Sequence, residues 1–153
     1  MSPTISFITN NPVETKDLGK KLGQLLKAGD CVLLDGELGA GKTTFTQGIA
    51  LSLNIRGDVT SPTFVIAREH KSLGQGPNLV HVDAYRLNTL AEISYLDLGT
   101  DIEQAILVVE WGKGLVNDLV ASPIQIKINH DENNEDKREF VITASEAIIK
   151  GLS

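Results

Sequence analysis

The chain has 153 residues, a length typical of one domain, and residues 1–153 are predicted to form a single α/β domain. Its 14 basic and 20 acidic residues give a net charge of −6, and no run of Lys or Arg is long enough to indicate direct binding of RNA or DNA. The single cysteine cannot form an internal disulfide, and no apolar stretch has the length of a membrane span or of a signal peptide. We therefore expect a cytoplasmic protein without membrane contact.

The first thirty residues predict an edge strand followed by a helix. The segment Ser6-Phe7-Ile8 is short and apolar enough for an edge strand. The pair Asn11-Pro12 is typical of a helix start, because proline fits the first helical position, and Gly29 is predicted to close this helix.

Next comes a strand that turns into a helix. Residues 31–34 form a continuous apolar run of the kind found in buried parallel strands. Phe45, Ile49 and Leu53 then recur at the four-residue spacing of a helix face, and that helix is predicted to end near Asn54.

The residues between this strand and this helix match the phosphate-binding pattern G-x-x-x-x-G-K-[ST] at every fixed position. Glycines let the backbone wrap around phosphate oxygens, and the N–H groups of the following helix point at the anion. Lys42 is predicted to reach the β- and γ-phosphates, and the Thr43 hydroxyl is predicted to bind Mg²⁺. The predicted nucleotide-binding residues are Gly36, Glu37, Leu38, Gly39, Ala40, Gly41, Lys42, Thr43 and Thr44.

The second half of the chain predicts two hairpins and a last helix. Residues 64–69 and 79–83 are predicted strands separated by a glycine-rich turn, and residues 124–128 pair naturally with 139–143. The remaining predicted elements are a short helix over 89–98, a buried strand over 106–109 and a terminal helix from about Ser145. With the phosphate loop, these elements predict a three-layer P-loop NTPase fold with a mixed, mainly parallel sheet and antiparallel hairpins.

Two acidic residues follow predicted strands and are candidates for catalysis and Mg²⁺ binding beside Lys42. Glu110 follows four consecutive apolar residues, whereas His81 interrupts the apolar run before Asp83. Strand pattern alone therefore favours Glu110 as the second, Walker-B carboxylate, with Asp83 also retained as a metal ligand and catalytic acid. The alternative for each residue is a solvated acid at a strand end.

Four more residues are candidates for a nucleotide switch or a partner contact. Ser61 and Thr63 lie about twenty residues after Lys42, where their hydroxyls could reach the γ-phosphate, although a proline-fixed turn is an equal alternative. Arg86 could contact phosphate or a partner, or form a surface ion pair, and Trp111 could pack on nucleotide, on a partner or in the core.

The remaining chemistry-bearing residues are assigned structural roles. Cys31 is predicted to be a small buried hydrophobe in its strand. The three histidines, His70, His81 and His130, lack metal-ligand spacing and are interpreted as structural or exposed.

Taken in order, these motifs resemble the bacterial TsaE (YjeE) family, small P-loop ATPases required for making the threonylcarbamoyladenosine modification of tRNA. The resemblance rests on four segments at the family's approximate spacing. They are Gly-Glu-Leu-Gly-Ala-Gly-Lys-Thr-Thr at 36–44, Ser-Pro-Thr-Phe at 61–64, Asp-Ala-Tyr-Arg-Leu at 83–87 and Glu-Trp at 110–111.

The resemblance implies an accessory ATPase, using ATP and Mg²⁺, that acts with the partner proteins TsaD and TsaB. TsaD would carry out threonylcarbamoyl transfer, ATP hydrolysis would support turnover, and tRNA would be held by the partners. Asp83 and Glu110 become the two essential acids and Thr63 the switch hydroxyl. Residues 112–114 and the final hairpin match nothing in the family's pattern.

Three other functions compete with this one. A small-molecule or nucleotide kinase uses the same loop, but such enzymes usually carry several arginines on a lid, and this chain has four arginines in all. A GTP switch would need an Asn-Lys-x-Asp element, which the sequence lacks, so adenine is favoured. A binding module that uses nucleotide only structurally would not need Asp83 and Glu110.

Overall fold

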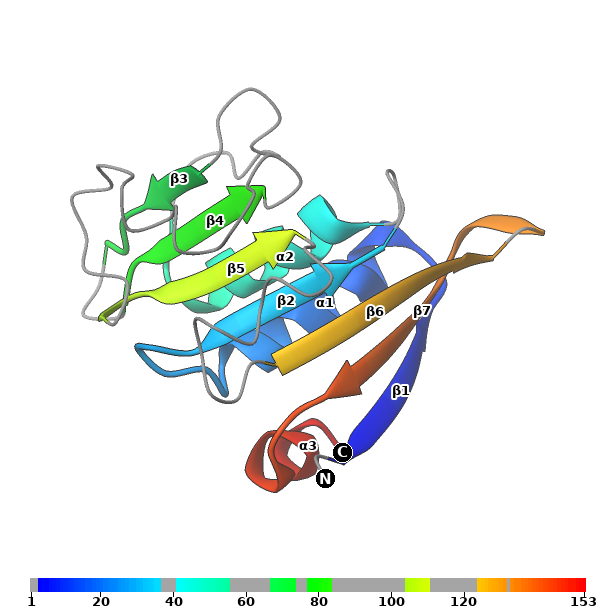
Figure 1. Ribbon diagram of the computed structural model, residues 1–153. Helices are drawn as coiled ribbons and strands as arrows, with labels where there is room; N and C mark the ends of the chain where they lie inside the picture. Colours follow the sequence, from blue (N-terminus) through cyan, green and yellow to red (C-terminus); the bar gives the residue numbers. More distant parts are fainter. Residues whose placement is uncertain are drawn as a thin grey trace.

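The computed structural model describes residues 3–36, 41–55, 67–73, 77–83, 104–110, 124–131 and 133–153, without the side chains of residues 67–69, 83 and 135. Within these ranges, seven strands form one sheet in the order β1-β7-β6-β2-β5-β4-β3 (Figure 1). The strands are β1 Thr4–Thr9, β2 Cys31–Asp35, β3 Ala67–His70, β4 Leu79–Asp83, β5 Ile106–Glu110, β6 Ile124–Asp131 and β7 Asn134–Thr143. The described helices are α1 Pro12–Gly23, α2 Lys42–Ser52 and α3 Glu146–Leu152.

The four central strands, β6, β2, β5 and β4, run parallel to one another, and the three outer strands pair antiparallel. Strand β5 is buried along its whole length, and β2 is buried up to its last residue, Asp35. Such uninterrupted apolar runs suit parallel strands, which are covered on both faces. The predicted α/β class with a mixed sheet and antiparallel hairpins is confirmed.

The hairpin of β6 and β7 is longer than the predicted pairing of 124–128 with 139–143. The predicted pairing of the two segments is confirmed, and the structure sets its register, with Ile126 opposite Ile142 and Ile128 opposite Phe140. Beyond it, polar residues continue the ladder to Asp131, and Figure 1 shows this end of the hairpin projecting from the sheet. Backbone pairing depends weakly on side-chain polarity where a strand is solvated, so composition underestimates the length of such strands.

Helix α1 begins as predicted and ends earlier than predicted. The Asn11 side chain accepts a hydrogen bond from the Glu14 N–H at 2.9 Å, and Pro12 follows as the first helical residue. The helix ends at Gly23, so the prediction that Gly29 closes it was wrong. Gly29, with φ of 93°, instead forms the turn into β2, where its N–H donates to the Ala105 carbonyl at 2.8 Å.

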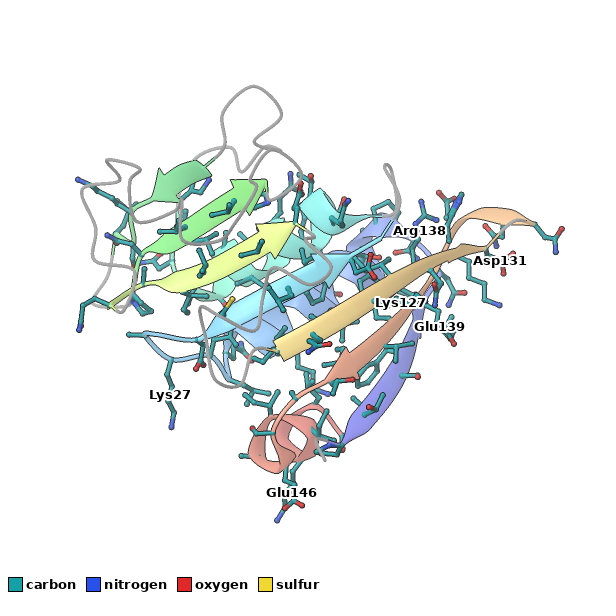
Figure 2. All side chains as sticks on the ribbon, in the orientation of Figure 1. Lys27, Lys127, Asp131, Arg138, Glu139 and Glu146 are labelled. Carbon is teal, nitrogen blue, oxygen red and sulfur yellow. The ribbon has the colours of Figure 1, made fainter. Side chains whose placement is uncertain are left out.

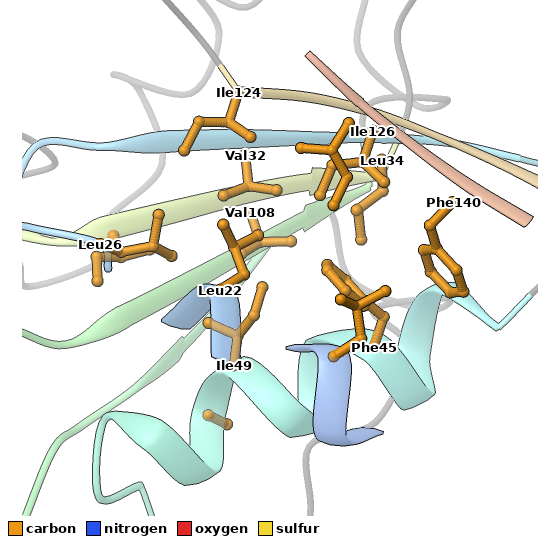
Figure 3. Close-up of a cluster of buried hydrophobic side chains, with 14 of the residues drawn as sticks. Leu22, Leu26, Val32, Leu34, Phe45, Ile49, Val108, Ile124, Ile126 and Phe140 are labelled. Carbon is orange, nitrogen blue, oxygen red and sulfur yellow. The ribbon is translucent and has the colours of Figure 1, made fainter. Parts of the chain in front are cut away.

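Helices α1 and α2 pack side by side against one face of the sheet (Figure 1). Two glycines allow the close approach: a Cβ on Gly19 would overlap the Phe45 carbonyl, and one on Gly48 would overlap the Lys16 carbonyl. Together the helices and the sheet enclose the core of Figure 3, in which Phe45 and Phe140 lie 5.2 Å apart between ring centroids. This packing fixes the position of α2, which carries Lys42 at its start.

Helix α3 begins after Ser145, whose hydroxyl accepts a hydrogen bond from the Ile148 N–H. It packs beside the ends of β1 and β7, and Leu152 is fully buried. Across the described parts of the chain, no helix has the length and apolar character needed to cross a membrane.

Candidate functional site

The site is built on the end of β2 and the start of α2. Strand β2 ends at Asp35, and α2 starts at Lys42 after Gly41, which has φ of 100°. Only glycine adopts this left-handed conformation without strain. The first turn of α2 contains no acidic residue and no side-chain cap, a composition that suits a helix start that binds an anion.

Lys42 connects the two ends of the phosphate loop. Its Nζ donates a hydrogen bond to the Gly36 carbonyl oxygen at 2.8 Å, and the residue is 8% exposed. Its position at the helix start is held partly by Thr46, whose hydroxyl donates to the Lys42 carbonyl at 2.8 Å. The ammonium group is therefore held beside the Gly36 carbonyl, just after the end of β2.

Glu110 lies at the end of the strand next to β2. It pairs in register with Leu34, two residues before Gly36, and with Asp83 on its other side. Leu34 belongs to the core under α1 and α2, and register partners share a face, so the Glu110 side chain lies on the helix face of the sheet. The residue is 5% exposed. A buried carboxylate at the carboxyl end of a parallel strand, beside a phosphate loop, is typical of a catalytic or metal-binding acid.

His81 is the nearest charged or titratable neighbour that the structure shows for this carboxylate. Its Nε2 lies 3.3 Å from Glu110 Oε1, and its side chain is fully buried. The sequence-based interpretation of His81 as a structural residue therefore omitted a contact with the candidate catalytic acid.

A hollow of about 110 Å³ lies beside the N-terminus of α2, on the side of β2 that faces β7 rather than β5. It is lined by Pro12 and Thr15 of α1, Gly41 and Thr44 at the start of α2, and Asp136 and Arg138 of β7. Figure 2 shows Arg138 on β7 near the α1 and α2 ends. The hydroxyl of Thr15, which lines the hollow, is hydrogen bonded to that of Thr9 at 2.7 Å.

Arg138 was missed by sequence reasoning, which singled out only Arg86 among the arginines. Arg138 lies almost a hundred residues after the phosphate loop, in a strand whose alternation gave no sign of its neighbours. Only the sheet order brings β7 alongside the first turns of α1 and α2. The available signal was weak: one arginine in the otherwise mixed charges of the final hairpin.

Comparisons with known proteins agree with this geometry. Residues 9–140 match the family model described as threonylcarbamoyl adenosine biosynthesis protein TsaE. The tRNA threonylcarbamoyladenosine biosynthesis protein TsaE of Streptomyces coelicolor is 55% identical over 131 residues, covering 84% of this chain and 88% of that one. This chain belongs to the TsaE family.

Further relatives support the assignment to the TsaE family across nearly the whole chain. The TsaE protein of Bacillus subtilis is 41% identical over 143 residues, covering 92% of this chain and 85% of that one. The crystal structure of Bacillus subtilis YdiB superposes with a TM-score of 0.77 at 34% identity, covering 99% of this chain and 95% of that one. The resemblance predicted from the four motifs is confirmed, as is the fold class.

The donor set of this TsaE-family chain suits a hard cation shared with phosphates. Among the described residues, no group of three or more His, Cys, Asp or Glu side chains could hold a metal ion without help. Mg²⁺ does not require such a group, because it commonly binds one or two protein oxygens together with phosphates and water. The Thr43 hydroxyl at the loop and the buried Glu110 carboxylate could supply those oxygens.

Several predicted site residues lie outside the described residues. They are Glu37, Leu38, Gly39 and Ala40 of the loop, together with Ser61, Thr63, Arg86 and Trp111. The predicted helix over 89–98 also lies outside. For Asp83 the backbone is described and places it directly beside Glu110 in the sheet.

Proposed function

We propose that this chain binds and hydrolyses Mg-ATP as an accessory component of the machinery that forms threonylcarbamoyladenosine on tRNA. In this role it supports turnover of the TsaD-TsaB threonylcarbamoyl transferase. Family membership supports the pathway. One observation carries the ATPase: Lys42 is hydrogen bonded to Gly36 at the end of β2, while a buried carboxylate, Glu110, ends the adjacent parallel strand.

Each candidate site residue is assigned a role in ATP binding or hydrolysis from its position in the fold. The N–H groups at the start of α2 and the Lys42 ammonium bind the β- and γ-phosphates. Thr43, Glu110 and Asp83 would hold Mg²⁺, which when bound would supply positive charge beside the phosphate oxygens. Glu110 also orients the attacking water and accepts its proton, because it is the buried acid nearest the loop in the strand register.

The nucleotide lies across the start of α2 with its two ends on opposite sides of β2. In the sheet order, β5 with Glu110 is on one side of β2, and β7 with Arg138 is on the other. The γ-phosphate therefore points toward Glu110, and the nucleoside end extends toward the hollow beside Gly41 and Arg138. ATP is proposed because the sequence has no guanine-reading Asn-Lys-x-Asp element.

The partners provide what the chain lacks. Its acidic balance gives no footprint for RNA, so tRNA is reached through TsaD and TsaB. Partner binding would respond to the bound nucleotide through four candidate switch or contact residues, Ser61, Thr63, Arg86 and Trp111. A partner that completes a P-loop site can raise turnover 10³-fold or more.

The test measures ATP hydrolysis and complex formation with purified TsaD and TsaB. The parent should hydrolyse ATP slowly alone and faster with partners, and its partner affinity should differ between ATP and ADP. Glu110→Gln should bind Mg-ATP with near-parent affinity and lose at least a hundredfold in single-turnover hydrolysis. Glu146→Gln, which changes an exposed acid of α3, is the matched control.

Two results would contradict the proposal. Turnover that ignores the partners, with equal partner affinity in ATP, ADP and no nucleotide, would remove the accessory role and favour the kinase alternative. Full hydrolysis by Glu110→Gln would remove Glu110 from the chemistry.

A further inference from the structure

His81 occupies a core position where an apolar residue is expected. It lies in the middle of β4, opposite Val108 of β5, and that valine faces the core under the helices. Its neighbours Val80 and Val82 are also fully buried, and the exposure of His81 itself is 0%. Burying a polar ring costs free energy unless its nitrogens find partners, so the position calls for a specific contact.

The contact available is Glu110. His81 Nε2 and Glu110 Oε1 lie 3.3 Å apart, with the two side chains 0% and 7% exposed. Neither atom makes an aligned hydrogen bond with any described residue, the 3.3 Å contact included, and the same holds for His81 Nδ1. Each group thus depends on the other: the imidazole needs an acceptor and the carboxylate oxygen needs a donor.

We propose that His81 is a positioning residue for Glu110. In this arrangement the Nε2–H of His81 donates to Oε1, which fixes the carboxylate torsion and leaves Oε2 for the Mg²⁺ ion or the attacking water. The inference rests on the proposed function in one respect, the role of Glu110 beside the phosphates. The contact itself is independent of that role.

Strand geometry explains why His81 reaches Glu110 and not the nucleotide. His81 is two residues before Asp83, the register partner of Glu110, so it lies one pleat further from the phosphate loop. His81 therefore contacts the Glu110 carboxylate from the side away from the phosphate loop. Partners of this kind typically change metal affinity or activity by 10–100-fold when they are removed.

The first test compares variants for their Mg²⁺ requirement. His81→Leu keeps side-chain volume and removes the donor, whereas His81→Gln retains an N–H donor at a similar reach. We expect His81→Leu to raise the Mg²⁺ concentration for half-maximal ATP hydrolysis about tenfold or more, and to lower kcat with little change in KM. His81→Gln should recover most of this loss. Val80→Ala, on the same strand and the opposite face, controls for general loss of packing.

The second test needs no nucleotide, metal or activity. Nitrogen and proton NMR of the His81 ring in the free protein should show the Nε2–H tautomer with a downfield proton. In Glu110→Gln that proton should move upfield, because a hydrogen bond to a carboxylate is stronger than one to an amide. A His81 ring that only fills the core would give the same signal in both proteins.

The two tests separate failure of this inference from failure of the proposed function. An unchanged ring signal in Glu110→Gln overturns the inference whatever the protein hydrolyses. If the ring signal responds, equal Mg²⁺ requirements for His81→Leu and Val80→Ala overturn the positioning role.

If His81→Leu does not fold, the Mg²⁺ requirement of His81→Gln and the ring signals test the inference instead. A His81→Gln variant that needs tenfold more Mg²⁺ than the parent contradicts the proposed donor role. Failure of ATP hydrolysis in the parent concerns the proposed function alone.

Discussion

Lys42 places a positive charge between Gly36 and the start of α2, the two described ends of the phosphate loop. Lys42→Ala should lower Mg-ATP affinity or turnover about a thousandfold, because no other described residue places an ammonium there; this loss corresponds to about 4 kcal/mol. Calorimetric titration on the folded variant measures it. Lys127→Ala, which removes an exposed lysine of β6, should bind as the parent does. Equal affinity and turnover in Lys42→Ala and Lys127→Ala would place the phosphates elsewhere.

The buried thiol of Cys31 leads to a prediction about how the stability of the protein changes with pH. Burial, with a smaller contribution from the charge of Asp30, raises the pKa of its thiol from 9.0 to about 12. Between these values the unfolded chain has lost the proton while the folded chain keeps it, so the thiol's contribution to stability falls as pH rises through this window. Below pH 9 both states are protonated and the contribution is constant.

Urea unfolding of the parent and of Cys31→Ala at several pH values checks this. The stability difference between parent and variant should shift against the parent from pH 9 upward and stay constant below. If the free energies of unfolding of parent and Cys31→Ala differ by the same amount at every pH, the thiol titrates alike in the folded and unfolded chains. Alkylation of native Cys31 at pH 8 should also be much slower than that of a free thiol.

At this scale, sequence predicted the residues whose chemistry is local. The loop pattern located Lys42, and the apolar run before Glu110 indicated a buried strand ending in an acid. The contacts of His81 and Arg138 could not be predicted, because each depends on which strands become neighbours. A single chain's residue pattern carries little information about that order.

Among the elements, α1 and α2 define the position of the phosphate loop through two glycines. Gly48→Ala places a methyl group against the Lys16 backbone, which cannot rotate away as a side chain can. We expect the free energy of unfolding to fall by about 2 kcal/mol, or roughly 6 °C in melting temperature. Because α2 carries Lys42, nucleotide affinity should fall as well.

Thermal unfolding followed by circular dichroism measures the effect of Gly48→Ala. Gly151→Ala is the matched control, since the atoms nearest its added Cβ belong to the Leu25 side chain, at 2.8 and 2.9 Å, and that side chain can shift. If both variants melt alike, the helices have room to separate and the close approach is not what fixes α2.

Element types were more predictable than element ends. Strand alternation correctly gave the pairing of β6 with β7, and the register came from the structure. The end of α1 was predicted wrongly because Leu25 and Leu26 continue the apolar spacing beyond Gly23, while the backbone already turns toward β2. A glycine signals a left-handed residue, and sequence does not distinguish a helix cap from the turn that precedes a strand.

The whole molecule carries a net charge of −6, and this charge limits the affinity that the free protein can have for tRNA. Nucleic-acid affinity comes largely from Lys and Arg that neutralise phosphates and release counterions. With 14 basic against 20 acidic residues, the chain repels a polyanion on average. We expect the free protein to bind tRNA with a dissociation constant of roughly 10⁻⁴ M or weaker at physiological salt, the weak end of non-specific binding.

Fluorescence anisotropy of labelled tRNA tests this, with the chain alone and with TsaD and TsaB present. The chain alone should give no saturation and little salt dependence, because few counterions are displaced. With the partners, tRNA should bind with a steep salt slope that belongs to them, and adding the chain should change that affinity according to nucleotide state. Micromolar binding by the chain alone, falling steeply with salt, would reveal a basic surface that its composition conceals and would give this protein direct contact with tRNA.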